Sequence, residues 1–253
     1  MGKTGLPRFG ELDFLRGIAI VSMVAFHGLG DLSLLKRGRH LEGDLFNLWQ
    51  QGTAILFLAL FGIAAYLSYA RNGSQKETRF RRRLRKGLIL FGWGMIITLI
   101  TYFFLRERCV VFGILHLMGV GSVLVYPLLP LRSYNLILGA LIVLAGNYLS
   151  GLRFKFAWLA WLGLIPSGFN SIDYFPIAPW LGYILVGVFL GNLFYPGGEP
   201  RLNWTGFSSN PIVKTFSLLG RHSLLIYLVH QPLLVAIIGA LIYRTEGNLL
   251  NCM

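Results

Sequence analysis

Charged residues are scarce in this chain, at 13% of its 253 residues. A water-soluble domain of this length would need far more polar surface, and 55% of these residues are hydrophobic. Among the charged residues the acidic ones are fewer, with 10 Asp and Glu against 23 Lys and Arg, so the net charge is +13. In a hydrophobic chain such an excess of Lys and Arg is typical of loops beside anionic lipid, and no nucleic acid partner is predicted.

Cysteines and processing signals are few as well. Cys109 and Cys252 lack the spacing of a metal or redox motif and are too few for a disulfide framework, so no metal site is predicted. The first apolar run continues into His27 and Asp31 without a small-residue cleavage site, so we expect it to stay as the first span. No internal repeat or linker is visible, which predicts a single domain over 1–253.

The apolar residues fall in runs long enough to cross a membrane. A helix of about 20 residues spans the hydrocarbon core. We predict an all-α, polytopic bundle of seven transmembrane helices, at 13–35, 46–70, 86–105, 110–130, 134–151, 174–196 and 218–243. The segment 152–173, with Trp158 and Pro166, is typical of an interfacial or re-entrant segment, and the count becomes eight if it also crosses.

The basic run from Lys76 to Lys86 sets the expected orientation. Lys and Arg are enriched in the cytoplasmic loops of membrane proteins. We therefore place this run in the cytoplasm as a solvated loop beside anionic lipid, with the N-terminus inside and, after seven spans, the C-terminus outside. The basic stretch at 36–39 opposes this orientation, but the sum of Lys and Arg still favours it. The predicted location is the cell membrane.

Three histidines are expected at a similar depth in the outer half of the membrane. His27 lies about 16 Å beyond Arg16 along a helix, and His116 and His230 reach a similar level from other spans. A single histidine could simply hydrogen-bond between helices. Asp31 follows His27 at i+4, and a carboxylate that orients a histidine raises its basicity. We therefore predict that His27, Asp31, His116 and His230 form a catalytic site.

A second polar group is expected at the cytoplasmic mouth of the bundle. Asp13 and Arg16 open the first span, and Arg221 and His222 lie at the same level at the start of the last. Arg16 either pairs with Asp13 at i−3 or faces a phosphate, for which a guanidinium fork is well suited. We predict that these four residues bind the anionic part of a cofactor-like substrate.

Three blocks of this sequence resemble one family. ELDFLRGIAI at 11–20, followed by FHG at 26–28, resembles the opening helix of the heparan-α-glucosaminide N-acetyltransferase-like membrane proteins, which are transmembrane acyltransferases. FGILHLMG at 112–119 and GRHSLLIYLVHQP at 220–232 resemble the middle and closing motifs of the small prokaryotic branch of that family. The resemblance covers most of the chain.

The resemblance implies a helical bundle that takes an acyl group, commonly acetyl, from cytoplasmic acyl-CoA and passes it to an amine or hydroxyl on the far side. The implied partners are acetyl-CoA as donor, a sugar or glycan as acceptor and the lipid bilayer; no metal is implied, and a homodimer stays open. His27 occupies the first-span polar position, where the lysosomal member carries an amide. This chain is several helices shorter than that protein and lacks its lumenal domain, so heparan sulfate is not the expected acceptor.

Acyl transfer from a thioester needs a base for the attacking amine or hydroxyl and donors for the oxyanion. On this hypothesis His27, held by Asp31, is the base, while His116 and His230 position the thioester or stabilise the oxyanion. Arg16 and Arg221 bind the phosphates of CoA. A covalent acyl-histidine and direct transfer both stay open.

Three other functions use the same polar residues. Intramembrane histidines on different helices can ligate haem in electron-transfer proteins. A transporter can use them as a pathway, although no inverted repeat is visible here. A structural membrane protein would merely satisfy them by hydrogen bonds between helices.

Overall fold

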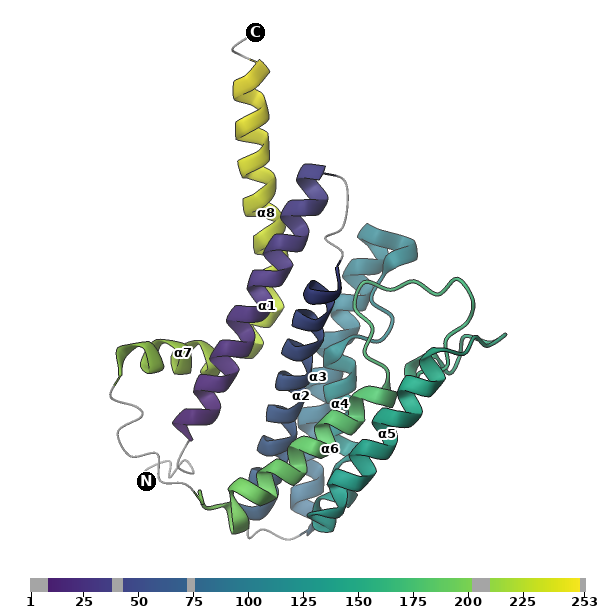
Figure 1. Cartoon of the computed structure of the whole chain (residues 1–253), viewed down its shortest axis with the longest axis vertical. Helices are drawn as coiled ribbons and strands as arrows, with labels where there is room; N and C mark the ends of the chain where they lie inside the picture. Colours follow the sequence, from purple (N-terminus) through teal and green to yellow (C-terminus); the bar gives the residue numbers. More distant parts are fainter. Residues whose placement is uncertain (1–8, 38–42, 72–75, 202–209, 251–253) are drawn as a thin grey trace. The chain divides into compact units, whose positions relative to one another are not determined.

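A computed structural model describes residues 9–37, 43–71, 76–201 and 210–250, and this part of the chain is built from helices (Figure 1). The α-helices are α1 (Gly10–Arg37), α2 (Asp44–Arg71), α3 (Lys76–Leu105), α4 (Ile114–Leu124), α5 (Tyr134–Ser150), α6 (Ile177–Phe194), α7 (Pro211–Arg221) and α8 (Ser223–Leu250). Short 3-10 turns lie between them: η1 (Arg106–Arg108), η2 (Tyr126–Leu131), η3 (Ala160–Leu162) and η4 (Pro196–Gly198). The chain forms two compact units, a terminal unit of 1–57 with 204–253 and a central unit of 58–203.

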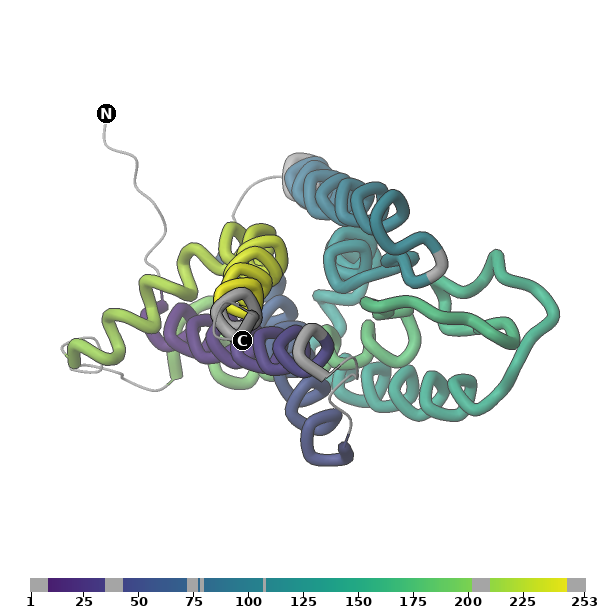
Figure 2. Tube along the Cα trace, turned by 90° about the horizontal axis from the view of Figure 1, so that it is seen from above, coloured from purple at the N-terminus to yellow at the C-terminus, as the bar shows by residue number. Residues whose placement is uncertain are grey.

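The terminal unit is organised around α1. α8 runs alongside α1, and α7 packs against it (Figure 1, Figure 2). The α1–α7 contact is close because it is made at glycines: a Cβ at Gly17 would overlap the carbonyl oxygen of Phe216, and one at Gly220 would overlap that of Asp13. Such small-residue contacts are the usual way for membrane helices to approach each other. They bring the start of α1 beside the end of α7.

The central unit contains two antiparallel helix pairs, α3 with α4 and α5 with α6 (Figure 1). Glycines again lie at the contacts. Gly87 of α3 faces Gly119 of α4, and Gly139 of α5 faces Gly182 of α6. Because the backbones meet directly at these positions, larger side chains would force each pair apart.

Five helices of the described part are long and apolar enough to cross a membrane: Gly10–Leu34, Asp44–Arg71, Phe80–Leu105, Ile177–Phe194 and Ser223–Arg244. α4 and α5 are apolar but shorter. The 11 residues of α4 rise only about 16 Å, against about 30 Å of hydrocarbon. The expectation of an all-helical, multi-pass membrane protein is confirmed, while the count of seven spans stays a prediction.

The segment 152–173, which is not among the seven predicted spans, is not a spanning helix in the structure: it is irregular, contains η3, and pairs Phe154 with Pro166 in an isolated bridge. The start of the last predicted span differs from the structure. The last predicted span, 218–243, begins inside α7, and the helix breaks at His222 before α8 starts. The sequence pattern did not reveal this break, because apolar residues continue from the end of α7 into the start of α8.

The basic run 76–86 is helical and forms the first turns of α3. Arg and Lys favour helices, and Arg81 pairs with Glu77 at i+4, with Nη2 and Oε1 3.0 Å apart. Arg83 is half-buried and donates a hydrogen bond to the carbonyl of Ala65 on α2, so this run is only partly solvated. In the opposing basic stretch, positions 38–39 lie outside the described residues.

Candidate functional site

Two of the predicted histidines lie against each other in the terminal unit. His27 comes from α1 and His230 from α8, and their ring centroids are 5.0 Å apart with the planes at 58°. Phe26 packs on His27 at 4.6 Å and Tyr227 on His230 at 5.6 Å between ring centroids. The first and last spanning helices therefore bring two imidazoles into one aromatic cluster.

The tautomer of His230 follows from its hydrogen bond. Its Nδ1 lies 2.6 Å from the carbonyl oxygen of Tyr227, one turn earlier on α8. A carbonyl oxygen only accepts, so Nδ1 carries the proton and Nε2 of the neutral ring holds a lone pair. That Nε2 is buried and has no hydrogen-bond partner within the described part of the chain, and the residue is only 8% exposed. An unsatisfied buried acceptor costs about 1–3 kcal/mol, so this nitrogen is suited to accept a proton from a bound group.

Asp31 is joined to the residue that follows His230. The side-chain nitrogen of Gln231 lies 3.0 Å from both carboxylate oxygens of Asp31. A carboxylate accepts hydrogen bonds and does not donate them, so the amide nitrogen of Gln231, and not its oxygen, faces Asp31. The amide oxygen of Gln231 is then buried without a hydrogen-bond partner among the described residues. Gln231 was missed from sequence, although its place beside His230 in the closing block was a usable signal.

His116 lies in the central unit and has both ring nitrogens engaged. The backbone N–H of Gly113 donates to Nδ1 over 3.1 Å, so the proton of the neutral ring sits on Nε2. Nε2 lies 3.4 Å from the hydroxyl of Thr98, which in turn donates to the carbonyl of Val110 over 2.7 Å. This pattern links α3 to the first turn of α4. It corresponds to the simpler of the two expectations for an intramembrane histidine, a hydrogen bond between helices.

The mouth residues gather around one buried carboxylate. Asp13 accepts from Nη1 of Arg16 over 3.2 Å and from Nε of Arg221 over 3.3 Å. The close backbone contact at Gly220 places the end of α7 against Asp13 and so permits the second bond. Three of the four predicted residues are thus joined, and His222 lies next to them as an exposed residue. One carboxylate between two guanidiniums leaves a net positive charge and free N–H groups, an arrangement that can hold an anion.

A hydroxyl network that was not predicted fixes α1 against the first part of α2. The indole N–H of Trp49 donates to the hydroxyl of Ser22 over 2.7 Å. The hydroxyls of Ser22 and Thr53 are 2.8 Å apart, and Thr53 also donates to the Trp49 carbonyl. Trp49 in turn packs edge-on against Phe26, at 6.1 Å between ring centroids. The network therefore holds α1, the helix that carries His27, against the first part of α2.

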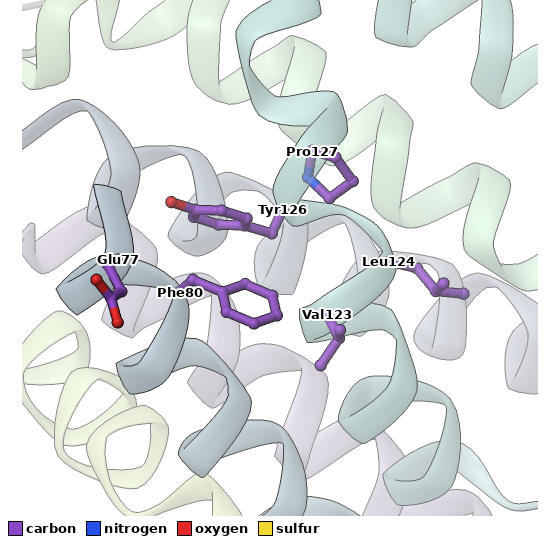
Figure 3. Close-up of a pocket in the computed structure, with 6 residues that line it drawn as sticks. All are labelled: Glu77, Phe80, Val123, Leu124, Tyr126 and Pro127. Carbon is purple, nitrogen blue, oxygen red and sulfur yellow. The ribbon is translucent and has the colours of Figure 1, made fainter. Parts of the chain in front are cut away.

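Two cavities lie among the described residues of the central unit. One, of about 680 Å³, is lined by Glu77, Phe80, Val123, Leu124, Tyr126 and Pro127 (Figure 3). The other, of about 370 Å³, is lined by Tyr66, Tyr69, Ala70, Leu129, Pro130, Arg132, Asn192, Pro196 and Gly197. Neither contains a predicted catalytic residue. Within the described part of the chain, no three His, Cys, Asp or Glu side chains are grouped so that they could hold a metal ion.

Comparison with known proteins agrees with the sequence blocks. The family model described as heparan-alpha-glucosaminide N-acetyltransferase, catalytic, matches residues 8–232, a range that contains all eight predicted site residues. No curated protein and no solved structure matches the chain. The match covers most of the sequence and crosses both compact units. The chain therefore belongs to the heparan-alpha-glucosaminide N-acetyltransferase family, a family of membrane acetyltransferases.

Proposed function

We propose that this chain moves an acetyl group from cytoplasmic acetyl-CoA to an amine or hydroxyl of an extracytoplasmic sugar or glycan. The family match supports acetyl transfer in general. The observation that carries the site is the buried, unpartnered Nε2 of His230 beside the ring of His27. A general base in acyl transfer needs such a lone pair within reach of the nucleophile.

The proposed step uses His230 as the base. The nucleophile gives its proton to Nε2 of His230 as its nitrogen or oxygen attacks the thioester carbonyl carbon. The carbon–sulfur bond then breaks, and the departing thiolate takes the proton from His230, which gives the acetylated acceptor and CoA thiol. From the sequence alone, His27 is the predicted base. The bond from His230 to the Tyr227 carbonyl favours His230, and His27 is left to donate a hydrogen bond to the oxyanion.

An amine is the acceptor that suits this site better than a hydroxyl. His230 Nε2 and the Gln231 amide oxygen are two buried acceptors without partners among the described residues. A primary amine brings two N–H donors, whereas a hydroxyl brings one O–H. Asp31 supports this role indirectly, because it holds the Gln231 amide in place. We therefore propose N-acetyl transfer, with Gln231 as the residue that orients the amine.

The donor is proposed to enter at the mouth formed by Asp13, Arg16 and Arg221, with His222 at its rim. Guanidiniums bind phosphates through charge-assisted hydrogen bonds. Eleven residues of α1 separate Arg16 from His27, which is about 16 Å along the helix. The extended pantetheine arm of CoA covers such a distance. We propose with it that the N-terminus lies in the cytoplasm, and the positive charge of the run 76–86 supports this orientation.

The proposal treats 1–253 as one acyltransferase domain, because the family match crosses both compact units. His116 keeps a positioning role within the central unit, since its hydrogen bonds hold the first turn of α4. A homodimer is compatible with the proposal but not required by it.

The test is acetyl transfer by the purified full chain in proteoliposomes, with acetyl-CoA and glucosamine as substrates. His230→Asn should fold and bind acetyl-CoA, yet lose turnover by at least about 100-fold, the usual contribution of a general base. Thermal unfolding and acetyl-CoA binding serve as controls for the fold. Turnover of His230→Asn near that of the unchanged protein would contradict the proposal.

The same preparation tests the other functions considered from sequence. A transporter would carry a substrate into the vesicles without acetyl-CoA, and a haem protein would show a Soret band.

A further inference from the structure

The larger cavity of the central unit has a polar edge and an apolar interior (Figure 3). Phe80 of α3 points toward Val123 at the end of α4, and the ring of Tyr126 lies beside it, at 5.4 Å between ring centroids. The carboxylate of Glu77 and the hydroxyl of Tyr126 lie at one side of the cavity, away from Val123 and Leu124 (Figure 3). The cavity therefore suits an amphiphile.

The position of the cavity along α3 corresponds to the edge of a membrane. The part of α3 that could span the bilayer is Phe80–Leu105, but its first turns still carry the basic residues that end at Lys86, and the apolar residues begin at Gly87. The turns from Glu77 to Lys86 therefore lie at the level of the lipid headgroups, while the turns from Gly87 on meet the acyl chains. An occupant would thus have its polar end among headgroups and its apolar end between Phe80 and Val123.

The run of α3 that carries Glu77 and Phe80 is positively charged. The carboxylate of Glu77, which lines the cavity, is paired with Arg81 over 3.0 Å. In the next turns of α3, Arg82, Arg85 and Lys86 are exposed, and within the described part of the chain none of them forms an ion pair. Basic clusters at the membrane surface attract anionic lipid headgroups.

We infer that this cavity binds an anionic phospholipid of the surrounding bilayer. One acyl chain lies between Phe80 and Val123, and the phosphate lies near Arg82 and Arg85. The acyl chain adds no selectivity, because it leaves an equally apolar environment when it enters the cavity. Selectivity comes from the headgroup charge. The site takes no part in the proposed acetyl transfer.

The test is native mass spectrometry of the full chain after incubation with equal amounts of phosphatidylglycerol and phosphatidylcholine in detergent. The protein should retain phosphatidylglycerol at least severalfold more than phosphatidylcholine. Val123→Trp, which fills the cavity, should lose this retained lipid. Ile89→Trp is the matched control, because Ile89 is an exposed residue of α3 that does not line the cavity.

A second variant tests the headgroup charge without changing the side chains that pack around the cavity. The double variant Arg82→Glu with Arg85→Glu changes exposed residues only and should remove the preference for phosphatidylglycerol. Lys155→Glu, an exposed lysine of the loop after α5, should keep it. Equal retention of the two lipids by the unchanged protein would overturn the inference. So would displacement of the retained lipid by palmitoyl-CoA together with weaker palmitoyl-CoA binding in Val123→Trp, because the cavity would then belong to an acyl-CoA site.

Discussion

The imidazoles of His27 and His230 are in contact, with ring centroids 5.0 Å apart, although they come from the first and last spanning helices of the chain. His230 has one nitrogen bound to the Tyr227 carbonyl and the other buried without a partner in the described part of the chain. The two histidines are therefore chemically distinct. Because their surroundings differ, we expect substitutions of His27 and of His230 to have different effects on turnover and stability.

His27→Asn should reduce kcat by about 100-fold, as loss of one oxyanion donor does, and should leave KM for acetyl-CoA unchanged. Steady-state kinetics of the purified variant in proteoliposomes provide the measurement. A rise in KM with an unchanged kcat would instead assign His27 to donor binding.

His116→Leu should destabilise the protein by about 1–3 kcal/mol, because the buried Gly113 N–H and the Thr98 hydroxyl lose their shared partner. Thermal unfolding in detergent measures the change. His230→Leu is the matched comparison, since it removes one hydrogen bond, that of Nδ1 to the Tyr227 carbonyl, and an Nε2 that has no partner in the described chain. That variant should keep more stability than His116→Leu while losing turnover. The reverse order of stabilities would contradict the structural role assigned to His116.

Arg221→Gln should raise KM for acetyl-CoA by about 10-fold, because one charge-assisted hydrogen bond to the donor is lost. The value of kcat should stay unchanged, since the mouth lies about 16 Å from the histidines. Lys214→Gln is the control on the same helix, because it removes an exposed charge away from Asp13. Equal changes in KM for both variants would point to a general effect of surface charge and not to a phosphate site.

Gly220→Val should separate α7 from α1, because even a Cβ at this position overlaps the carbonyl oxygen of Asp13. Overpacking of this kind costs about 1–3 kcal/mol. The melting temperature should fall, and KM for acetyl-CoA should rise as the Asp13–Arg221 bond is lost. Gly239→Val on α8 is the matched control, since a Cβ there has no heavy atom within 4 Å. Similar melting temperatures for the two variants would refute a close α1–α7 contact.

Tyr174, in the loop before α6, should make stability fall at alkaline pH. Its hydroxyl donates to the Ala160 carbonyl over 2.6 Å, and burial raises its pKa to about 12. The ordinary pKa of a tyrosine is about 10. The fold thus favours the neutral hydroxyl, so this stabilisation is complete below about pH 10 and is lost as the pH rises through 12.

Unfolding temperatures measured between neutral and strongly alkaline pH test this expectation. Tyr174→Phe should be less stable at neutral pH by about 1 kcal/mol, the net value of one hydrogen bond. It should also lose less stability on alkalinisation than the unchanged protein. Parallel pH profiles for the two proteins would rule out Tyr174 as the source.

The helices were predictable because the length of an apolar run is a local property. All seven predicted spans overlap a helix of the structure, and the family suggested by the three sequence blocks is confirmed. Prediction from the sequence was wrong where the same composition is compatible with two kinds of local structure. The run 76–86 has the composition of a solvated loop and of a helix start, and only its continuation into α3 distinguishes them.

The polar site was predictable in part, because an ionisable residue within an apolar run is also a local property of the sequence. His27 and His230 stood out because imidazoles are rare and costly in hydrocarbon. Gln231 did not stand out, because an uncharged amide carries a weaker signal. Its link to Asp31 also joins two helices that are distant in sequence.

By itself, the sequence determined that this is a multi-pass helical membrane protein of an acetyltransferase family. Run length, composition and short motifs are enough for that, because hydrocarbon accepts only segments that satisfy their own backbone hydrogen bonds. Only the tertiary structure decided which polar atoms are satisfied. In the folded chain both ring nitrogens of His116 have hydrogen-bond partners, whereas Nε2 of His230 has none among the described residues. Hydrogen bonds depend on distances between helices, and these are set by contacts such as Gly220 against Asp13, which no local pattern encodes.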